Sequence, residues 1–233
     1  MRLVVVGCEY AGTTTLVNGI RRWAEENMAA DWTILHDHYK IPHIDGHPDD
    51  LTPEQQRQFS ELDPRIKEIA QRHNIYYHFK ETNYDRADHV VVGWYIEDTI
   101  YGEKYFGYGG EGQPGRRDLD WAIVEKGILG YGPDTVLLLV KASPEVIRRR
   151  MRSDPHPDQI VKDGDVEEVL GLFHDAFNRS ALRHKIVIDT SASAVGESVA
   201  EFVRQVEPTF NNRDRLRVLV ERAKRRGDWI DGK

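Results

Sequence analysis

Apolar residues form short unbroken runs along this chain, and the stretches between the runs place apolar residues every three or four positions. A short run bounded by glycine or polar residues is typical of a buried strand in a parallel sheet, whereas the wider spacing is typical of a helix. The strand-like runs occupy residues 2–6, 32–35, 88–93, 135–140 and 185–188. The helical stretches occupy residues 13–30, 63–72, 119–129, 143–152, 166–180 and 194–206, and another begins at residue 52. This alternation predicts an α/β fold with a parallel sheet of about five strands and helices on both faces.

Two of the predicted helices have explicit start signals. Thr52 precedes Pro53 and has Gln55 three residues later, which is the arrangement of an N-cap with a capping box. Ser143 precedes Pro144 in the same way. Both helices are therefore expected to begin at the proline.

Two segments are harder to assign. Residues 75–84 are ambiguous, although Ile75, Phe79 and Thr82 suit a helix that continues from the one before. Glycines crowd residues 102–115, which predicts a loop with a role in substrate binding or with high mobility.

The last 26 residues differ in charge from the rest of the chain, which divides it into a domain at 1–207 and a basic appendage at 208–233. The appendage has eight Lys and Arg and four Asp and Glu, which gives it a net charge of +4. Because the whole chain has a net charge of −7, the remaining residues have a net charge of −11. An apolar stripe predicts an amphipathic helix within it; the stripe consists of Leu216, Leu219, Val220 and Ala223. This helix is expected to pack on the domain or on a second subunit, with an anionic partner as the alternative.

Composition narrows the class of protein. The 233 residues are 39% hydrophobic and 30% charged, as in a globular chain, and the net charge of −7 argues against sequence-independent nucleic-acid binding, so no nucleic-acid partner is expected. Cys8 is the only cysteine, which excludes an intramolecular disulfide and a cysteine zinc site. No apolar run approaches the ~18 residues of a membrane span, and Gly7 comes too early for a signal peptide. A cytoplasmic protein without a membrane partner is therefore expected.

The first strand-like run leads into Gly7-Cys8-Glu9-Tyr10-Ala11-Gly12-Thr13-Thr14-Thr15, and a helical stretch follows. These nine residues, called the phosphate loop below, have the glycine spacing and the setting of the motif G-x-x-x-x-G-K-[ST]. Glycines let successive backbone N–H groups turn inward around a phosphate, and the helix N-terminus adds positive potential. Thr14 occupies the hydroxyl position that binds Mg²⁺, and Thr15 extends the run of hydroxyls. The residues predicted to bind the donor phosphates are Gly7, Tyr10, Ala11, Gly12, Thr13, Thr14 and Thr15.

The motif has one departure, because Thr13 stands where lysine is usual. That lysine neutralises the outer phosphates and supports phosphoryl transfer. The backbone can still bind phosphate without it, but the loss of one charge costs such a site several kcal/mol unless another cation replaces it. A glycine turn in an unrelated doubly wound fold is the alternative interpretation.

With these residues the chain resembles the P-loop kinases of the nucleoside, nucleotide and thymidylate kinase group, over roughly residues 1–206. The stretches that carry the resemblance are 7–15, 134–150 and 188–191. The second is similar to the strand and helix before the lid of those kinases, and the third to their last strand and adenine-side loop. The resemblance implies a three-layer P-loop NTPase fold, a lid near 148–165, and ATP with Mg²⁺ as the cofactors.

The resemblance also implies roles near the ends of the second and third predicted strands. Asp37 stands where deoxynucleoside kinases place a carboxylate beside the acceptor, so it is a candidate catalytic base, with a cap or loop hydrogen bond as the alternative. Residues 94–98 keep the acids of the family's acidic–Arg motif but lack its arginine. Glu97 is a candidate for holding Mg²⁺ or its water shell, and Tyr95 for lining the acceptor site.

Basic residues later in the chain are further candidates. Arg116 and Arg117 open a helix and are candidates for holding an acceptor phosphate, with a solvated helix start as the alternative. Arg148 and Arg152 share a helix face at i, i+4 spacing and are candidate catalytic residues that stabilise transition-state charge; a surface ion pair is the alternative for each. Lys162 is a candidate replacement for the missing lysine charge.

Histidines and aspartates crowd residues 36–50, a pattern that is compatible with a transition-metal site. Their spacing matches no established zinc signature, so a polar acceptor-site loop is the favoured interpretation. The cluster consists of His36, Asp37, His38, His43, Asp45, His47, Asp49 and Asp50.

Three functions are compatible with these features. The first is an enzyme that transfers the γ-phosphoryl group of ATP to a nucleoside, nucleotide or similar small acceptor. The second is a regulatory protein that binds a nucleotide or phosphate with impaired catalysis, which Thr13 favours. The third is an atypical kinase acting on a modified nucleotide, a cofactor precursor or a polynucleotide end. A homodimer is compatible with each, because kinases of this group are often dimers.

Overall fold

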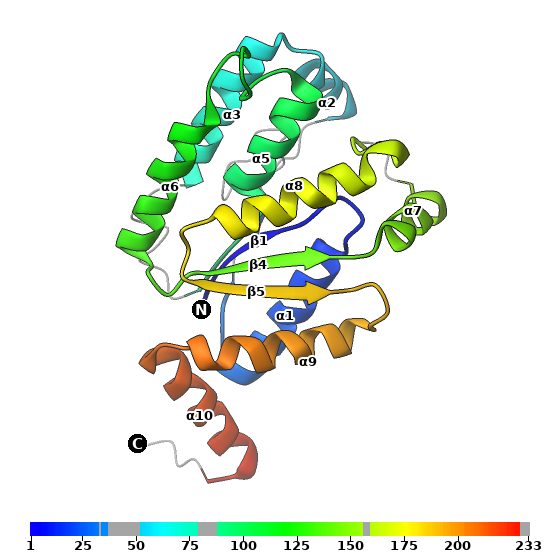
Figure 1. Cartoon of the computed structure of the whole chain (residues 1–233). Coiled ribbons are helices and arrows are strands. Elements are labelled where there is room, and N and C mark those ends of the chain that lie inside the picture. Colours follow the sequence, from blue (N-terminus) through cyan, green and yellow to red (C-terminus); the bar gives the residue numbers. More distant parts are fainter. Residues whose placement is uncertain (33, 37–51, 79–87, 156–158, 229–233) are drawn as a thin grey trace.

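The structure, a computed structural model, describes residues 1–233 except 33, 37–51, 79–87, 156–158 and 229–233. Its centre is a parallel sheet of five strands, the number predicted. The strand order is β2-β3-β1-β4-β5, in which β1, β4 and β5 are neighbours (Figure 1). The strands are β1 (Arg2–Val6), β2 (Ile34–His36), β3 (His89–Val92), β4 (Val136–Lys141) and β5 (His184–Asp189). Val5 pairs with Val92 on one side, and Val6 pairs with Leu139 on the other. The carboxyl end of β1 is therefore central in the sheet.

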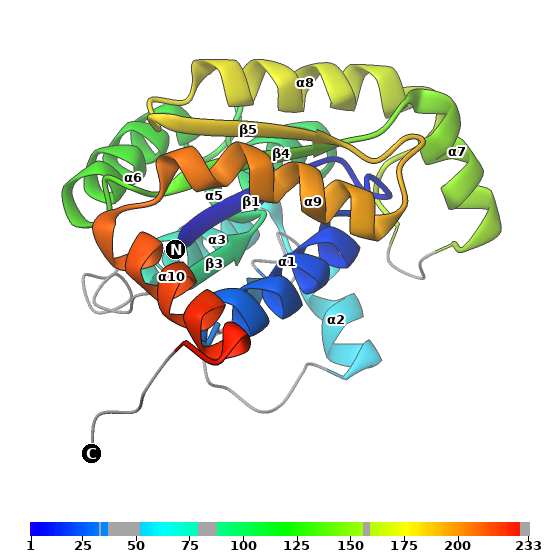
Figure 2. The ribbon, with the colours of Figure 1, turned by 90° about the horizontal axis from the view of Figure 1, so that it is seen from below.

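Helices cover both faces of the sheet and make it the middle of three layers (Figure 2). Alternate residues of β1 point to opposite faces, so Val4 and Val6 belong to one core and Leu3 and Val5 to the other. The first core is completed by α5 (Trp94–Tyr101), α6 (Arg117–Tyr131), α7 (Pro144–Ser153) and α8 (Val166–Arg179). The second is completed by α1 (Thr13–Met28), α9 (Val195–Val206) and α10 (Asn212–Arg226). Among the described helices, none combines the length and hydrophobicity that crossing a bilayer requires.

The two predicted helix starts are confirmed. α2 (Pro53–Ser60) begins after Thr52, whose hydroxyl accepts the N–H of Gln55 in a capping box. α7 begins after Ser143, which accepts the N–H of Val146. Each cap satisfies a backbone donor that the first helical turn would otherwise leave without a partner.

The ambiguous segment after residue 72 is helical as far as the structure describes it. α3 (Pro64–His78) continues six residues beyond the predicted end, and residues 79–87 lie outside the described part of the chain. α5, in contrast, was not predicted as a helix. Six of its eight residues are buried, so it lacks the polar face that makes a helix visible in a sequence.

The glycine-rich segment 102–115 is not the open loop that its composition suggests. Its first five residues form a π-helix, η1 (Gly102–Phe106), that continues α5. The rest is a loop closed by hydrogen bonds, among them Gly109 N–H to Pro114 O at 2.9 Å and Gln113 Nε2 to Glu103 O at 3.1 Å. Residues 107–115 are therefore a loop, as predicted, and hydrogen bonds within the segment fix its shape.

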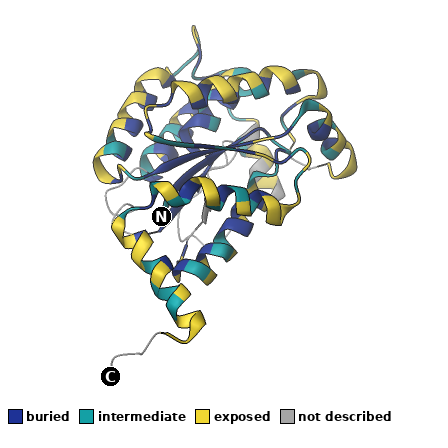
Figure 3. Ribbon diagram, turned by 60° about the horizontal axis from the view of Figure 1, so that its bottom comes forward, coloured by how far each residue is buried: buried dark blue, intermediate teal, exposed yellow. Residues whose placement is uncertain are grey.

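The basic C-terminal helix packs against α1 as predicted, but only two residues of the apolar stripe, Val220 and Ala223, are half-buried. Leu216 and Leu219 are 61% and 60% exposed, whereas Asp214 and Val218 are buried, and α10 is exposed over most of its surface (Figure 3). The packed face is set by Arg217, whose guanidinium donates to Asp88 at the start of β3. A paired carboxylate and guanidinium can be buried, so the apolar positions do not have to face inward.

Asp88 provides the first testable prediction. Burial acts to raise the pKa of its carboxyl, but hydrogen bonds at 2.8 Å from Arg217 and from the Met1 ammonium hold that pKa at about 2, below the ordinary 3.8. A depressed carboxyl pKa stabilises the native state above pH 3.8, and this stability disappears as the pH falls towards 2. We expect Asp88→Asn to lower the free energy of unfolding by about 2 kcal/mol at pH 7.

Urea unfolding of both proteins at pH 7 and below pH 4 measures this difference. The difference in the free energy of unfolding between the wild type and Asp88→Asn should be smaller at the lower pH. Asp228→Asn is the control, because its partner Arg226 lies on the surface and such pairs contribute about 0–1 kcal/mol. Equal losses in the two variants would contradict the prediction.

Candidate functional site

The phosphate loop joins the carboxyl end of β1 to the N-terminus of α1. Two of its residues have left-handed backbone conformations, Tyr10 with φ 65° and Gly12 with φ 90°. The Ala11 N–H donates to Cys8 O at 3.0 Å, and the first helical bond runs from Leu16 N–H to Gly12 O at 2.9 Å. No described side chain caps α1, so the N–H groups of its first turn are available to a ligand. An anion in the loop would also meet the positive end of the helix.

Gly7 is required by a close backbone contact. A Cβ at this position would lie 2.4 Å from Val140 O of the neighbouring strand and 3.0 Å from the Thr13 hydroxyl. Thr13, at the usual lysine position, thus places its hydroxyl beside Gly7 and is half-buried. Thr14 and Thr15 are exposed. The strand, the turn and the helix together have the arrangement that the sequence motif predicts.

Arg150 is a site residue that sequence reasoning missed. Its Nη1 donates to Tyr10 O at 2.8 Å and to the Thr190 hydroxyl at 3.1 Å, and its Nη2 donates to Thr190 O at 2.9 Å. The Thr190 hydroxyl in turn donates to Ala11 O at 2.6 Å. A guanidinium from α7 and a hydroxyl that follows β5 therefore brace the phosphate loop. Arg150 lies four residues after the apolar Val146, so the two side chains share one face of α7. This spacing is the signal in the sequence that could have indicated the inward position of Arg150.

The two lid arginines that were predicted to be catalytic lie elsewhere. Arg148 donates to Glu167 Oε1 at 2.7 Å and to Asp163 O at 3.0 Å, so the structure places it in the surface ion pair that was its alternative. Arg152 is exposed and forms no hydrogen bond or ion pair with any residue that the structure describes. Neither side chain has a described contact with the phosphate loop, and their catalytic role stays a prediction.

The phosphate loop also contacts the described part of the predicted lid. The Glu9 carboxylate accepts the backbone N–H groups of Ile160 at 3.0 Å and Val161 at 2.8 Å. The Tyr10 hydroxyl donates to Gln159 Oε1 at 2.8 Å. Residues 159–161, called the anchored segment below, are thus attached to the loop by side chains of the loop itself.

Cys8 is a buried residue of the phosphate loop and lies near enough to Glu97 to be affected by its charge. Burial raises the pKa of the Cys8 thiol, and the nearby carboxylates Glu9 and Glu97 raise it further. The thiol is therefore neutral and unsuited to act as a nucleophile. Glu97, half-buried in the first turn of α5, is the acid that the sequence predicted at the end of β3, the strand beside β1.

A magnesium ion would find hard oxygen ligands here, as its chemistry requires. The exposed Thr14 hydroxyl and the Glu97 carboxylate belong to elements that follow two adjacent strands. Within the described ranges, no group of three or more His, Cys, Asp or Glu residues is placed to hold a metal. The donor set therefore fits a cation that takes its remaining ligands from water and phosphate.

Tyr95 lies in the protein core and not at an acceptor site. It is 1% exposed, its ring packs edge-on against Trp94 and Trp121, and its hydroxyl donates to Glu125 Oε1 at 3.0 Å. We therefore leave Tyr95 out of the site.

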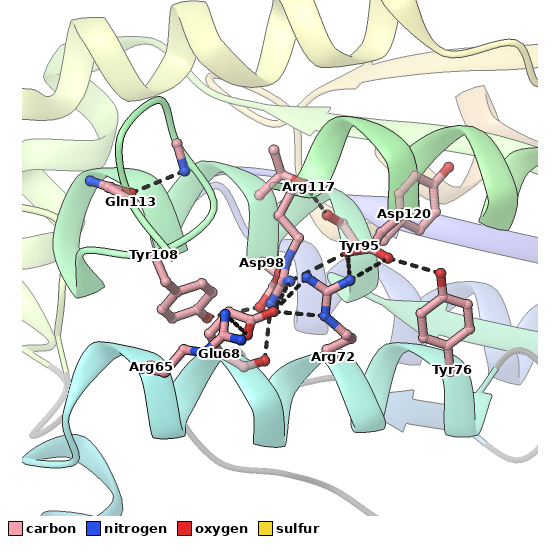
Figure 4. A network of polar contacts seen from close by, with 12 residues as sticks. Arg65, Glu68, Arg72, Tyr76, Tyr95, Asp98, Tyr108, Gln113, Arg117 and Asp120 are labelled. Carbon is pink, nitrogen blue, oxygen red and sulfur yellow. Dashed lines mark hydrogen bonds and ion pairs between the residues drawn. The ribbon is translucent and has the colours of Figure 1, made fainter. Parts of the chain in front are cut away.

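Arg117 belongs to a buried network of charges between α3, α5 and α6 (Figure 4). Its Nε donates to Asp98 at 2.5 Å, and its Nη1 donates to Glu68 at 2.8 Å and contacts Asp120 at 3.4 Å. These partners raise the pKa of the guanidinium against the effect of burial, so it stays charged. Its donors are directed to carboxylates, and we leave it out of a phosphate site. Arg116 is 73% exposed and pairs with Asp118 at 2.6 Å.

Two predicted features lie outside the described residues. Asp37, the candidate base, and the histidine-rich segment that follows it fall within residues 37–51. Asp37 directly follows β2, which pairs with β3. It stays a prediction.

Two solved structures resemble the chain over most of its length. The YorR protein from Bacillus subtilis, in complex with phosphorylated GDP, has a TM-score of 0.56 and 13% identity, with 88% of this chain and 95% of that chain covered. Deoxyadenosine kinase from M. mycoides, with the products dCMP and a flexible dCDP bound, has a TM-score of 0.55 and 10% identity, with 90% and 100% covered. No family model and no curated protein sequence matches the chain. At such identities the likeness shows the fold alone, and the chain shares the three-layer fold of these two structures.

Proposed function

We propose that this protein binds a nucleoside triphosphate in the phosphate loop and transfers its γ-phosphoryl group to a nucleoside, a nucleotide or a similar small acceptor. The observation that carries the proposal is the geometry of the loop. A strand at the centre of the sheet ends at Gly7, the backbone turns at Tyr10 and Gly12, and α1 begins with its first-turn N–H groups uncapped by any described side chain. Such a turn is suited to the phosphates of a nucleotide.

The chain's own groups have distinct roles in this proposal. Backbone N–H groups between Gly7 and Thr14 hold the donor phosphates, except those of Glu9 and Ala11, which donate to the Tyr101 hydroxyl and to Cys8 O. Arg150 adds positive potential beside Tyr10. Thr14 and Glu97 hold Mg²⁺ or its water shell; when bound, this ion neutralises charge that develops on the phosphates. Asp37 orients or deprotonates the acceptor hydroxyl. ATP is the proposed donor because the resemblance to nucleoside and nucleotide kinases implies it.

A second function, nucleotide binding without turnover, is favoured by one specific observation. Thr13 presents a half-buried hydroxyl beside Gly7 where a lysine ammonium is usual. A phosphoryl-transfer site that lacks one cation loses transition-state stabilisation, while the backbone nest still binds phosphate. Formation of ADP that depends on an acceptor would exclude this alternative.

The first test is a thermal-shift screen of the purified protein. ATP, GTP, ADP, nucleoside monophosphates and deoxynucleosides are compared, each with and without Mg²⁺. A ligand at 100 times its Kd stabilises the native state by ≈ 2.7 kcal/mol, so even a modest binder is detected. Stabilisation by a triphosphate, increased by one acceptor, supports the proposal. No shift with any nucleotide would contradict it.

Thr14 provides the second testable prediction. We expect Thr14→Ala to reduce phosphoryl transfer and Mg²⁺-dependent triphosphate binding by about tenfold or more, because a hydroxyl ligand is lost. Thr14→Ser keeps the hydroxyl and is the matched control. The side chain is exposed, so neither variant should change the unfolding temperature of the free protein. Full turnover in Thr14→Ala would show that Thr14 has no such role.

A further inference from the structure

The phosphate loop has an unusual distribution of charge. Threonine occupies the lysine position, and an acid, Glu9, lies within the loop. A carboxylate beside a triphosphate would repel it unless hydrogen bonds fix and stabilise the carboxylate elsewhere. A working site for a triphosphate therefore needs two things, a place for the Glu9 carboxylate and a cation that replaces lysine.

The anchored segment meets the first need. Ile160 and Val161 donate two consecutive backbone N–H groups to one oxygen of Glu9, at 3.0 and 2.8 Å. Charge-assisted hydrogen bonds of this kind are stronger than neutral ones. The acid in the loop thus has a definite structural partner, the backbone on the N-terminal side of Lys162.

The π-helix η1 contacts the short turn that follows Lys162. The Asp165 N–H donates to Lys162 O at 2.9 Å, and the Tyr105 hydroxyl donates to Asp165 Oδ2 at 3.0 Å. Lys104, on the same helix, pairs with Glu168 at 2.7 Å. The backbone is therefore held on both sides of Lys162, by the phosphate loop at residues 160 and 161 and, through Asp165, by a helix that continues α5. Isolated π-helical turns often occur at functional sites.

Lys162 is positioned by these contacts but not neutralised by them. Its side chain is exposed and forms no ion pair or hydrogen bond with any residue that the structure describes. The other cation fixed at the loop is Arg150, whose Nη atoms donate to Tyr10 O, Thr190 O and the Thr190 hydroxyl. The ammonium of Lys162, in contrast, is carried on a flexible four-carbon stem beside a residue attached to the loop.

We infer that Lys162 provides, from the anchored segment, the positive charge that Thr13 does not provide, and that Glu9 is the positioning residue that holds it there. The inference rests on the proposed function, because a triphosphate must occupy the phosphate loop. Its ligand is the terminal phosphate of a nucleoside triphosphate, so a diphosphate should depend on Lys162 less than a triphosphate does.

The test compares binding of ATP and ADP, measured by calorimetry with Mg²⁺, in matched variants of the full chain. Lys162→Ala should weaken ATP binding about tenfold or more and leave ADP binding within about twofold, and turnover should fall by about a hundredfold. Lys162→Arg should retain most of the ATP affinity. Lys126→Ala is the control, because Lys126 is an exposed lysine on α6; it should bind both nucleotides like the wild type.

A double variant examines the replacement directly. Thr13→Lys introduced into Lys162→Ala should restore the preference for ATP over ADP, since it returns the charge to the usual position of the motif. Glu9→Ala should weaken ATP binding and make a further Lys162→Ala change nearly silent, because the two residues act together. A merely structural role for Lys162 would give neither the rescue nor the selectivity for the triphosphate.

The outcomes separate the inference from the proposed function. If the wild type binds ATP but Lys162→Ala binds it equally well, the inference is wrong and the proposed function stands. If Lys162→Ala loses ATP and ADP affinity alike, or if Thr13→Lys restores nothing, the replacement role is also wrong. If the wild type binds no triphosphate, the proposed function and the inference fail together, before any variant is made.

Discussion

Arg117→Met is expected to lower the free energy of unfolding by about 3–5 kcal/mol, the largest stability effect that we predict for a single side chain. The guanidinium is 1% exposed and lies between the carboxylates of Asp98, Glu68 and Asp120, which are buried as well. Methionine fills much of the space but leaves Asp98 without its cation and removes one of the cations beside Glu68 and Asp120, which keep Arg72 at 2.7 and 3.0 Å. The cost is the desolvation of uncompensated charge rather than the loss of one favourable contact.

Chemical denaturation of the wild type and Arg117→Met at pH 7 measures this loss. Arg116→Ala is the matched control, because Arg116 is 73% exposed and pairs with Asp118 at the surface. This variant should change the free energy of unfolding by no more than about 0.5 kcal/mol. Adding Asp98→Asn to Arg117→Met should recover part of the loss by removing one buried charge. A loss below about 1 kcal/mol in Arg117→Met would show that the network contributes little.

The pH dependence of the Arg117 variant has a definite sign. Burial already raises the pKa of Asp98 even with Arg117 beside it. Without the guanidinium this pKa should rise further, so that protonation at mildly acidic pH removes the uncompensated charge. The stability difference between the wild type and the variant should therefore shrink as the pH is lowered from 7 towards 5. A constant difference over this range would contradict the electrostatic explanation.

Gly7→Ala is expected to abolish the stabilisation of the protein by nucleotides and to destabilise the free protein by about 1–3 kcal/mol. The added Cβ would lie 2.4 Å from Val140 O, a backbone atom at the centre of the sheet, so the phosphate loop would have to move away from β4. Such a movement displaces the N–H groups that we propose for the donor phosphates. Thermal unfolding with and without ATP and Mg²⁺ reports both effects.

Gly130→Ala is the control for the Gly7 variant. A Cβ at Gly130, near the end of α6, would meet no atom within 4 Å. Alanine there should stabilise the helix by roughly 0.5–1 kcal/mol and leave nucleotide binding unchanged. Nucleotide stabilisation that persists in Gly7→Ala would mean that phosphates do not bind at this loop.

The strands and most helices could be predicted because their signals are local. β1, β3 and β4 are short runs of apolar residues that are almost wholly buried, and most helices have a distinct polar side or a capping residue. α5 escaped prediction because it is buried on almost every side. The helix α10 was predicted, but the full set of residues on its packed side was not, because the ion pair of Arg217 with Asp88, 129 residues earlier, contributes to it.

The residues of the candidate site were likewise predictable where the signal is local and not where distant partners decide. The phosphate loop lies within nine consecutive residues between one strand and one helix, so its glycine spacing was visible in the sequence. Tyr95 and Arg117 looked like ligand-binding residues because a sequence does not show which polar side chains find partners inside the protein. Their partners, Glu125 for Tyr95 and Asp98 and Glu68 for Arg117, come from other helices.

The sequence by itself thus determined the parallel α/β architecture, the position of the phosphate loop and the absence of its usual lysine, because hydrophobic periodicity and a turn with two glycines are properties of neighbouring residues. Only the tertiary structure decided which distant groups surround that loop. Arg150 lies 140 residues from Tyr10, and Ile160 lies 151 residues from Glu9, yet each pair shares a hydrogen bond. Such contacts depend on how the strands are ordered and the helices packed, since parallel strands bring the loops after β1 and β4 to one edge of the sheet.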